Sequence, residues 1–169
     1  MERWDIDNPL QGKVKPEWIS DKIDQTTIDF AKEFGTYLAK DDSEVKLDKE
    51  GKPILDKNGI PKKNIFGDKL TTSQLRRFFG EVKRQQILGY NESSFVMLRP
   101  KLAYAVGRAK KSMKNEVKYC KIEDFYKIID DAIMIVVNSN DTKNAFKNFI
   151  AIFEAIVAYH KAEVKEKDK

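Results

Sequence analysis

The spacing of apolar residues in the last third of the chain places the strongest constraint on its fold. Two segments carry such residues at steps of three and four, which is the period of an α-helix with one buried face. The first segment contains Ile122, Phe125, Ile129, Ala132, Ile133 and Val136. The second contains Phe146, Phe149, Ile150, Phe153, Ile156, Val157 and His160. Only residues 138–141 separate them, and a connection this short predicts antiparallel neighbouring helices.

Three further segments show helical spacing, at residues 17–39, 71–86 and 94–111. Pro16 suits the first turn of the first helix, and the hydroxyl group of Thr71 can cap the second. Pro100 lies inside the third segment. This helix therefore either begins near Leu98 or kinks at the proline.

Residues 41–68 interrupt the helical pattern with three glycines and two prolines. The insert also contains a short internal echo, because Leu47–Gly51 reads LDKEG and Leu55–Gly59 reads LDKNG. The Asn58-Gly59 pair is a turn signal. The segment is therefore predicted to be an irregular insert, either a short hairpin or a mobile loop.

Taken together, these patterns predict an all-α fold. We expect a single-domain bundle of about five helices over residues 1–169, with the insert at residues 41–68. The chain ends in alternating lysines and acids, so residues 165–169 are expected to form a frayed tail.

The composition excludes several classes of protein. The single cysteine, Cys120, and the single histidine, His160, exclude an internal disulfide framework and a Cys- or His-rich metal site. The longest apolar run has six residues, at 132–137, whereas a membrane helix needs about twenty. With no apolar stretch after the charged N-terminal residues, no signal peptide is expected, and we predict a cytoplasmic protein. Nucleotide-binding and hydrolase motifs are also missing, so we expect no cofactor, no catalytic residue, no metal and no enzymatic activity.

The middle of the chain is strongly basic. The whole sequence carries a net charge of +5, but residues 71–118 contain eleven basic and three acidic residues. This stretch therefore contributes +8, and the remainder of the chain is slightly acidic. Such an uneven distribution favours a surface that binds a polyanion.

The basic residues follow helical faces. In the helix over residues 71–86, the cations predicted to lie opposite the apolar stripe are Arg76, Arg77, Lys83 and Arg84. In the helix over residues 94–111, a second face carries Met97, Lys101, Tyr104, Arg108 and Lys111. We predict that the two faces form one continuous basic strip, which holds phosphates by charge and stacks Tyr104 on a base or sugar. Two ordinary alternatives stay open: core packing for Tyr104 and an internal ion pair for Arg108.

Two other functions remain possible from the residues alone. The helix that carries Arg76 would serve as the recognition helix of a DNA-binding regulator, although the connection at residues 86–93 is a poor match to a helix-turn-helix. A metal-dependent nuclease would use the best carboxylate cluster of the chain, which consists of Glu123, Asp124, Asp130 and Asp131. These carboxylates lie beside an apolar stripe, where solvated acids are the ordinary outcome.

Two blocks of the sequence stand out, Leu70–Phe79, which reads LTTSQLRRFF, and Met97–Arg108, which reads MLRPKLAYAVGR. Together they resemble the small subunit of the type III-A CRISPR effector, the Csm complex. The resemblance implies a small, non-catalytic helical protein of antiviral defence that stacks in several copies. It also implies as partners the guide RNA, the target RNA, whose backbones it would contact, and the other subunits of the complex.

The resemblance also suggests which residues contact RNA. Arg76 and Arg77 match the basic end of the first block, and Lys101, Tyr104 and Arg108 match the second. Weaker candidates outside or at the edges of these blocks are Lys83, Arg84, Lys110 and Lys111.

Overall fold

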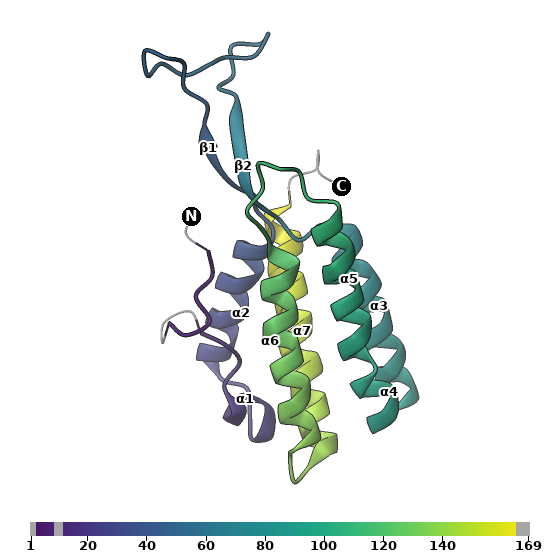
Figure 1. The fold of residues 1–169 in the computed structure, drawn as a ribbon. Helices are drawn as coiled ribbons and strands as arrows, with labels where there is room; N and C mark the ends of the chain where they lie inside the picture. Colours follow the sequence, from purple (N-terminus) through teal and green to yellow (C-terminus); the bar gives the residue numbers. More distant parts are fainter. Residues whose placement is uncertain (1–2, 9–11, 165–169) are drawn as a thin grey trace.

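The structure, a computed structural model, describes residues 3–8 and 12–164, so the predicted tail at residues 165–169 lies outside it. Two long helices stand at the centre, α6 (Lys121–Val137) and α7 (Thr142–Glu163). On one side they are flanked by α1 (Pro16–Ser20) and α2 (Gln25–Leu38). On the other side lie α3 (Thr72–Leu88), α4 (Glu92–Val96) and α5 (Leu98–Lys111) (Figure 1). Within the described ranges, every helix is too short or too polar to span a lipid bilayer.

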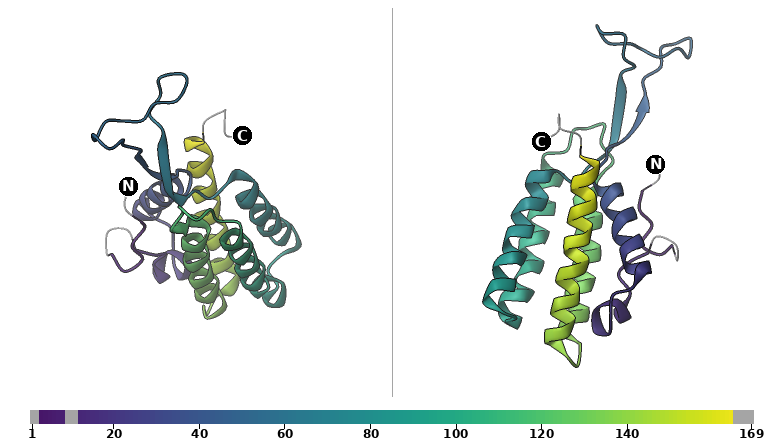
Figure 2. Two further views of the ribbon diagram at one scale, coloured as in Figure 1. Left: turned by 45° about the horizontal axis from the view of Figure 1, so that its top comes forward. Right: turned by 180° about the vertical axis from the view of Figure 1, so that it is seen from behind.

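A two-stranded arm leaves one end of the bundle (Figures 1 and 2). Its strands, β1 (Asp42–Val45) and β2 (Lys63–Asp68), pair in antiparallel fashion. At the base of the arm, β2 also pairs in parallel with β3 (Tyr119–Cys120), where Gly67 faces Tyr119. The prediction of an all-α fold is therefore correct only in part, because a small three-stranded sheet accompanies the helices. The hairpin forms because the extended residues before α6 offer strand β2 a partner edge. At this edge, the amide of Lys118 donates to the carbonyl of Phe66 at 2.8 Å.

Two of the predicted helices are each divided in two. The expected helix over residues 17–39 breaks at residues 21–24, because Asp24 and Thr27 form a reciprocal capping box that starts α2. The expected helix over residues 94–111 divides at Met97 into α4 and α5. Pro100 becomes the third residue of α5, where a backbone N–H has no partner within the helix. The alternative that placed the start near Leu98 is confirmed.

Three phenylalanines fix α3 against the central pair of helices. The rings of Phe78, Phe125 and Phe153 form a triangle with centroid distances of 5.7–5.9 Å, one ring from each of α3, α6 and α7. On the opposite side, α2 approaches α7 at Gly35. A Cβ atom at this glycine would lie 2.7 Å from the carbonyl oxygen of Ile156, so the absence of a side chain permits the close packing.

The base of the arm is held by a buried lysine. Lys121, the first residue of α6, has no exposed surface, and its ammonium group donates to the carbonyls of Tyr37 and Lys40 and to Oδ1 of Asp42 at 2.6–2.9 Å. The hydroxyl of Tyr119 donates to the other oxygen of Asp42. Burial lowers the pKa of Lys121, and the hydrogen bond to Asp42 opposes this shift. The network joins the end of α2, the start of the arm and the start of α6.

His160 is a core residue, as its place on the apolar face of the last helix predicts. It is fully buried, and its Nε2 donates to the carbonyl of Leu70 at 2.7 Å, just before α3 begins. Its other ring nitrogen is buried without a hydrogen-bond partner in the described part of the chain. Burial lowers the pKa of His160, and nearby Lys161 and Lys69 lower it further. The ring is therefore held in its neutral form.

We predict that Lys121→Met lowers the free energy of unfolding by about 3–5 kcal/mol, because it leaves the carboxylate of Asp42 buried without its cation. Urea denaturation measures the change. Lys127→Met is the matched control, since this lysine is exposed on the same helix, and it should change stability by less than about 0.5 kcal/mol. Equal effects of the two substitutions would contradict the network.

We also predict that His160→Gln makes stability less sensitive to acid. Because the pKa of His160 is lowered below 6.5 in the folded state, the unfolded chain binds more protons as the pH falls through that value. Titration of His160 therefore lowers the free energy of unfolding by at most about 1.4 kcal/mol for each unit by which the pH falls. Glutamine does not titrate, so the variant lacks this loss. Denaturation of both proteins between about pH 8 and pH 5 should show the advantage of the wild type shrinking toward acid. A constant difference would be evidence against a neutral, buried imidazole.

Candidate nucleic-acid interface

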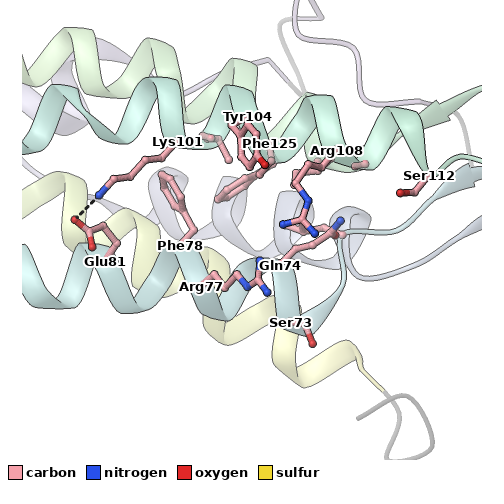
Figure 3. A pocket seen from close by; sticks show the side chains of 15 residues that line it. Ser73, Gln74, Arg77, Phe78, Glu81, Lys101, Tyr104, Arg108, Ser112 and Phe125 are labelled. Atoms are coloured by element: carbon pink, nitrogen blue, oxygen red, sulfur yellow. Dashed lines mark hydrogen bonds and ion pairs between the residues drawn. The ribbon is translucent and has the colours of Figure 1, made fainter.

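A groove of about 510 Å³ runs between α3 and α5, with α6 beneath it (Figure 3). Its floor is apolar and includes Phe78, Leu102, Ile122 and Phe125. Its rims are polar: α3 contributes Ser73, Gln74, Arg77 and Glu81, and α5 with the residue after it contributes Lys101, Tyr104, Arg108 and Ser112. The groove thus joins the two helices on which the sequence places most of the predicted cations.

The start of α3 is set by a local hydrogen-bonded pair. The hydroxyl of Thr71 accepts from the amide of Gln74 at 3.2 Å, and the side-chain oxygen of Gln74 accepts from the amide of Thr71 at 2.9 Å. With this start, Leu75 and Phe78 face the core, and Arg77 lies on the side of the helix that faces α5. The burial of Leu75 and Phe78 therefore turns Arg77 toward the groove.

Two arginines converge on one end of the groove. Arg77 extends from α3 and Arg108 from α5, and Figure 3 shows both guanidinium groups pointing into the same space. Neither arginine forms an ion pair with any residue in the described part of the chain. Within residues 3–8 and 12–164, the structure thus shows no internal ion pair of the kind that the sequence left open for Arg108. Two planar guanidinium groups at one place offer several N–H donors to an anion such as phosphate.

Tyr104 stands on the rim between Lys101 and Arg108. Its side chain is 69% exposed, so it does not pack in the core. Because the ring is attached to a rigid helix and is open to solvent, it offers a stacking surface beside the two arginines.

Glu81 occupies the other end of the groove. Its carboxylate accepts hydrogen bonds from Arg84 at 2.7 Å and from Lys101 at 3.1 Å. Figure 3 shows the contact with Lys101. The hydrogen bond from Arg84 is the largest cause that lowers the pKa of Glu81 to about 2, and those from Gln85 and Lys101 add to it. Glu81 therefore stays ionised and neutralises cations that would otherwise face the groove.

The other predicted cations lie outside the groove. Lys83 pairs with Glu154 of α7 and stands over the ring of Phe79, and Lys110 pairs with Glu123 of α6 at 2.7 Å. Arg76 and Lys111 are exposed and form no ion pair within the described ranges, but neither lines the groove. The structure thus brings together Arg77, Lys101, Tyr104 and Arg108, with Arg84 at the edge through Glu81.

Three of the four acidic residues considered for a metal site are engaged with cations. Asp124 accepts from Arg3 at 2.9 Å and from the hydroxyl of Tyr37, and Glu123 pairs with Arg3 and Lys110. Asp130 pairs with Arg99 at 2.6 Å. In the residues that the structure describes, no three His, Cys, Asp or Glu side chains are grouped so as to hold a metal ion.

Sequence reasoning missed the polar residues at the ends of the groove. Ser73, Gln74 and Ser112 carry no signal of their own, because a serine or glutamine at a helix end is usually read as a cap. The pairing of Glu81 with Arg84 follows from their spacing of three residues. Its contact with Lys101 depends on how α5 packs beside α3, which no local pattern records.

Comparison with known protein families identifies the family of the chain. The family model described as Csm2 Type III-A matches residues 59–166. The chain belongs to the Csm2 Type III-A family. It is therefore a small subunit of a Csm complex, and the resemblance seen in the two sequence blocks is confirmed. No curated protein and no solved structure matches it.

The family match covers the whole groove of this Csm2-family chain. Helices α3 to α7 all lie within the matched residues. Helices α1 and α2, strand β1 and most of the outer part of the arm precede them. Of the two strands of the arm, β1 thus lies outside the matched residues and β2 lies within them.

Proposed function

We propose that the chain is the RNA-binding small subunit of a type III-A Csm effector complex, stacking in several copies along the guide and target RNA without catalysing a reaction. The observation that carries the proposal is that two arginines, Arg77 and Arg108, meet at one end of a groove with an apolar floor and form no ion pair with the described residues. Membership in the Csm2 Type III-A family supports the assembly in which this groove would act.

The groove supplies contacts suited to a sugar–phosphate backbone. A phosphate at the arginine end would receive charge-assisted hydrogen bonds from both guanidinium groups. The next nucleotide would lie against the apolar floor and stack on Tyr104, which is exposed on the rim. Contacts of this kind hold the backbone and leave the base edges unread, so binding would be independent of sequence.

We predict that Arg77→Ala/Arg108→Ala weakens binding to single-stranded RNA and reduces its salt dependence. If each subunit neutralises about four phosphates, two of them through Arg77 and Arg108, the slope of log K against log salt is about −3, and removing these two cations halves it. Fluorescence anisotropy with a labelled homopolymeric RNA at several salt concentrations measures both quantities. Circular dichroism should show unchanged helicity.

The matched control is Arg76→Ala/Lys111→Ala, which removes the same charge from the same two helices outside the groove. This variant should lose less affinity than the groove variant. Equal losses would indicate a diffuse basic surface in place of the groove. Tighter binding to duplex DNA than to single-stranded RNA would instead favour the DNA-binding regulator.

We predict that Glu81→Gln strengthens RNA binding by about threefold and makes the salt slope steeper, because it releases Lys101 and Arg84 to contact phosphates. The same anisotropy titration measures the change. Glu116→Gln removes an equal charge from an exposed position after α5 and serves as the control. If both substitutions act alike, general charge accounts for the gain and the groove does not.

A further inference from the structure

The arm rises from the end of the groove at which Arg77 and Arg108 meet. Only residues 69–71 separate strand β2 of the arm from helix α3, which forms one rim of the groove. The other rim, α5, is followed by residues 112–118, which lead directly to β3 at the base of the arm. Figure 1 shows this connection crossing the end of the bundle from which the arm projects. An RNA strand that leaves the groove at its arginine end therefore meets the base of the arm.

A lysine and an aromatic ring lie together at this base. The amide of Lys118 donates to the carbonyl of Phe66, and the ammonium group of Lys118 stands 5.9 Å from the centre of the Phe66 ring. The two residues are neighbours across β2 and β3, because Gly67 faces Tyr119 one position further on. Lys118 is exposed and Phe66 is half-buried. The pair thus offers a cation for a phosphate and part of a ring for a base.

Two more lysines lie further out on the same face of the arm. Alternate residues of a strand share a face, so Lys62 and Asn64 lie on the face that carries Phe66. In the pairing of β1 with β2, Glu44 faces Asn64. Two positions further out, the same register places Lys46 opposite Lys62, and the amide of Lys46 donates to the carbonyl of Lys62 at 2.8 Å.

The opposed lysines, Lys46 and Lys62, lack a compensating charge. Like charges directly opposite each other on two strands destabilise the sheet. Neither lysine forms an ion pair within residues 3–8 and 12–164. The acids on this face are Glu44, two positions further in, and the half-buried Asp68 next to the bundle, so the outer end of the face is the basic one. A phosphate held between the two ammonium groups would remove their repulsion.

We propose that this face of the arm is a second contact for the RNA strand that occupies the groove. The inference deepens the proposed function and rests on it, because the strand reaches the arm through the arginine end of the groove. Phosphates lie on the opposed lysines and on Lys118, and a base lies against Phe66. Between Phe66 and Lys62 the strand rises by about 14 Å, so the arm lengthens the RNA site by this distance.

Fluorescence anisotropy of the full chain with labelled oligouridylate tests the proposal, using a short RNA of about six nucleotides and a long RNA of about sixteen. The short RNA fills the groove, and only the long RNA also reaches the arm. Lys46→Gln/Lys62→Gln should weaken binding of the long RNA about 25-fold at about 0.1 M salt, because each lost phosphate contact removes about 0.7 from log K there. Binding of the short RNA should not change.

Lys49→Gln/Lys57→Gln is the matched control, since it removes the same charge from the two outer lobes of the arm, Leu47–Gly51 and Leu55–Gly59. Both lysines are exposed, and neither forms an ion pair in the part of the chain that the structure describes. The control should weaken binding of the long RNA by less than about threefold, because these charges are screened from the strand. Equal losses in the two variants would overturn the proposal, since the general charge of the arm would then explain both.

A single substitution at the base of the arm separates a lost contact from a damaged hairpin. Lys118→Gln leaves the opposed lysines in place and should weaken binding of the long RNA about fivefold at about 0.1 M salt. Lys46→Gln/Lys62→Gln removes a repulsion, so urea denaturation should show at least the stability of the wild type. If Lys118→Gln binds the long RNA as tightly as the wild type does, the proposed path from the groove to the arm is wrong.

The groove variant Arg77→Ala/Arg108→Ala distinguishes failure of this inference from failure of the proposed function. It should weaken binding of both RNAs. If it does so while Lys46→Gln/Lys62→Gln binds the long RNA like the wild type, the groove binds RNA and the arm contact alone is rejected. If the wild type binds neither RNA, the proposed function itself is rejected.

Discussion

The ammonium group of Lys121 holds together three parts of the chain that are far apart in sequence. It donates to backbone carbonyls at the end of α2 and to Asp42 at the start of the arm, while its own backbone begins α6. A buried cation is stable only when such partners surround it. The direction of the arm, the start of the central helix pair and the packing of α2 therefore depend on one group of hydrogen bonds.

The second constraint is the triangle of Phe78, Phe125 and Phe153, which sets the position of α3 on the central helices. With α3 fixed there and α5 packed on α6, a groove remains between them whose floor is formed by two of these same rings. The aromatic core thus determines the spacing of the rims. That spacing allows Arg77 and Arg108 to face one anion and Glu81 to reach Lys101.

The groove and the arm expose different side chains. The groove is cationic and lies within the part of the chain that the Csm2 Type III-A family model matches. The arm is aliphatic at its surface, and its outer lobes mostly precede the matched residues. The cations of the groove and the exposed aliphatic side chains of the arm therefore lie on separate parts of the molecule.

The sequence alone determined the helices with apolar stripes, the core place of His160, the basic middle of the chain and the resemblance to its family. These features are local or periodic, so they can be read without knowing which segments meet. It left open the choice between a hairpin and a loop for residues 41–68, since the partner edge of the hairpin comes from β3, more than fifty residues later.

Only the tertiary structure decided which cations share a surface. Arg76 and Arg77 are neighbours in sequence, yet Arg77 lines the groove and Arg76 does not; Lys83, on the same helix, pairs with Glu154 of α7. The helical pattern of a sequence gives the direction in which each side chain projects from its helix axis. It does not identify the residue that the side chain contacts. That neighbour is set by the packing of α3 and α5 on α6 and α7, which depends on long-range contacts between buried rings.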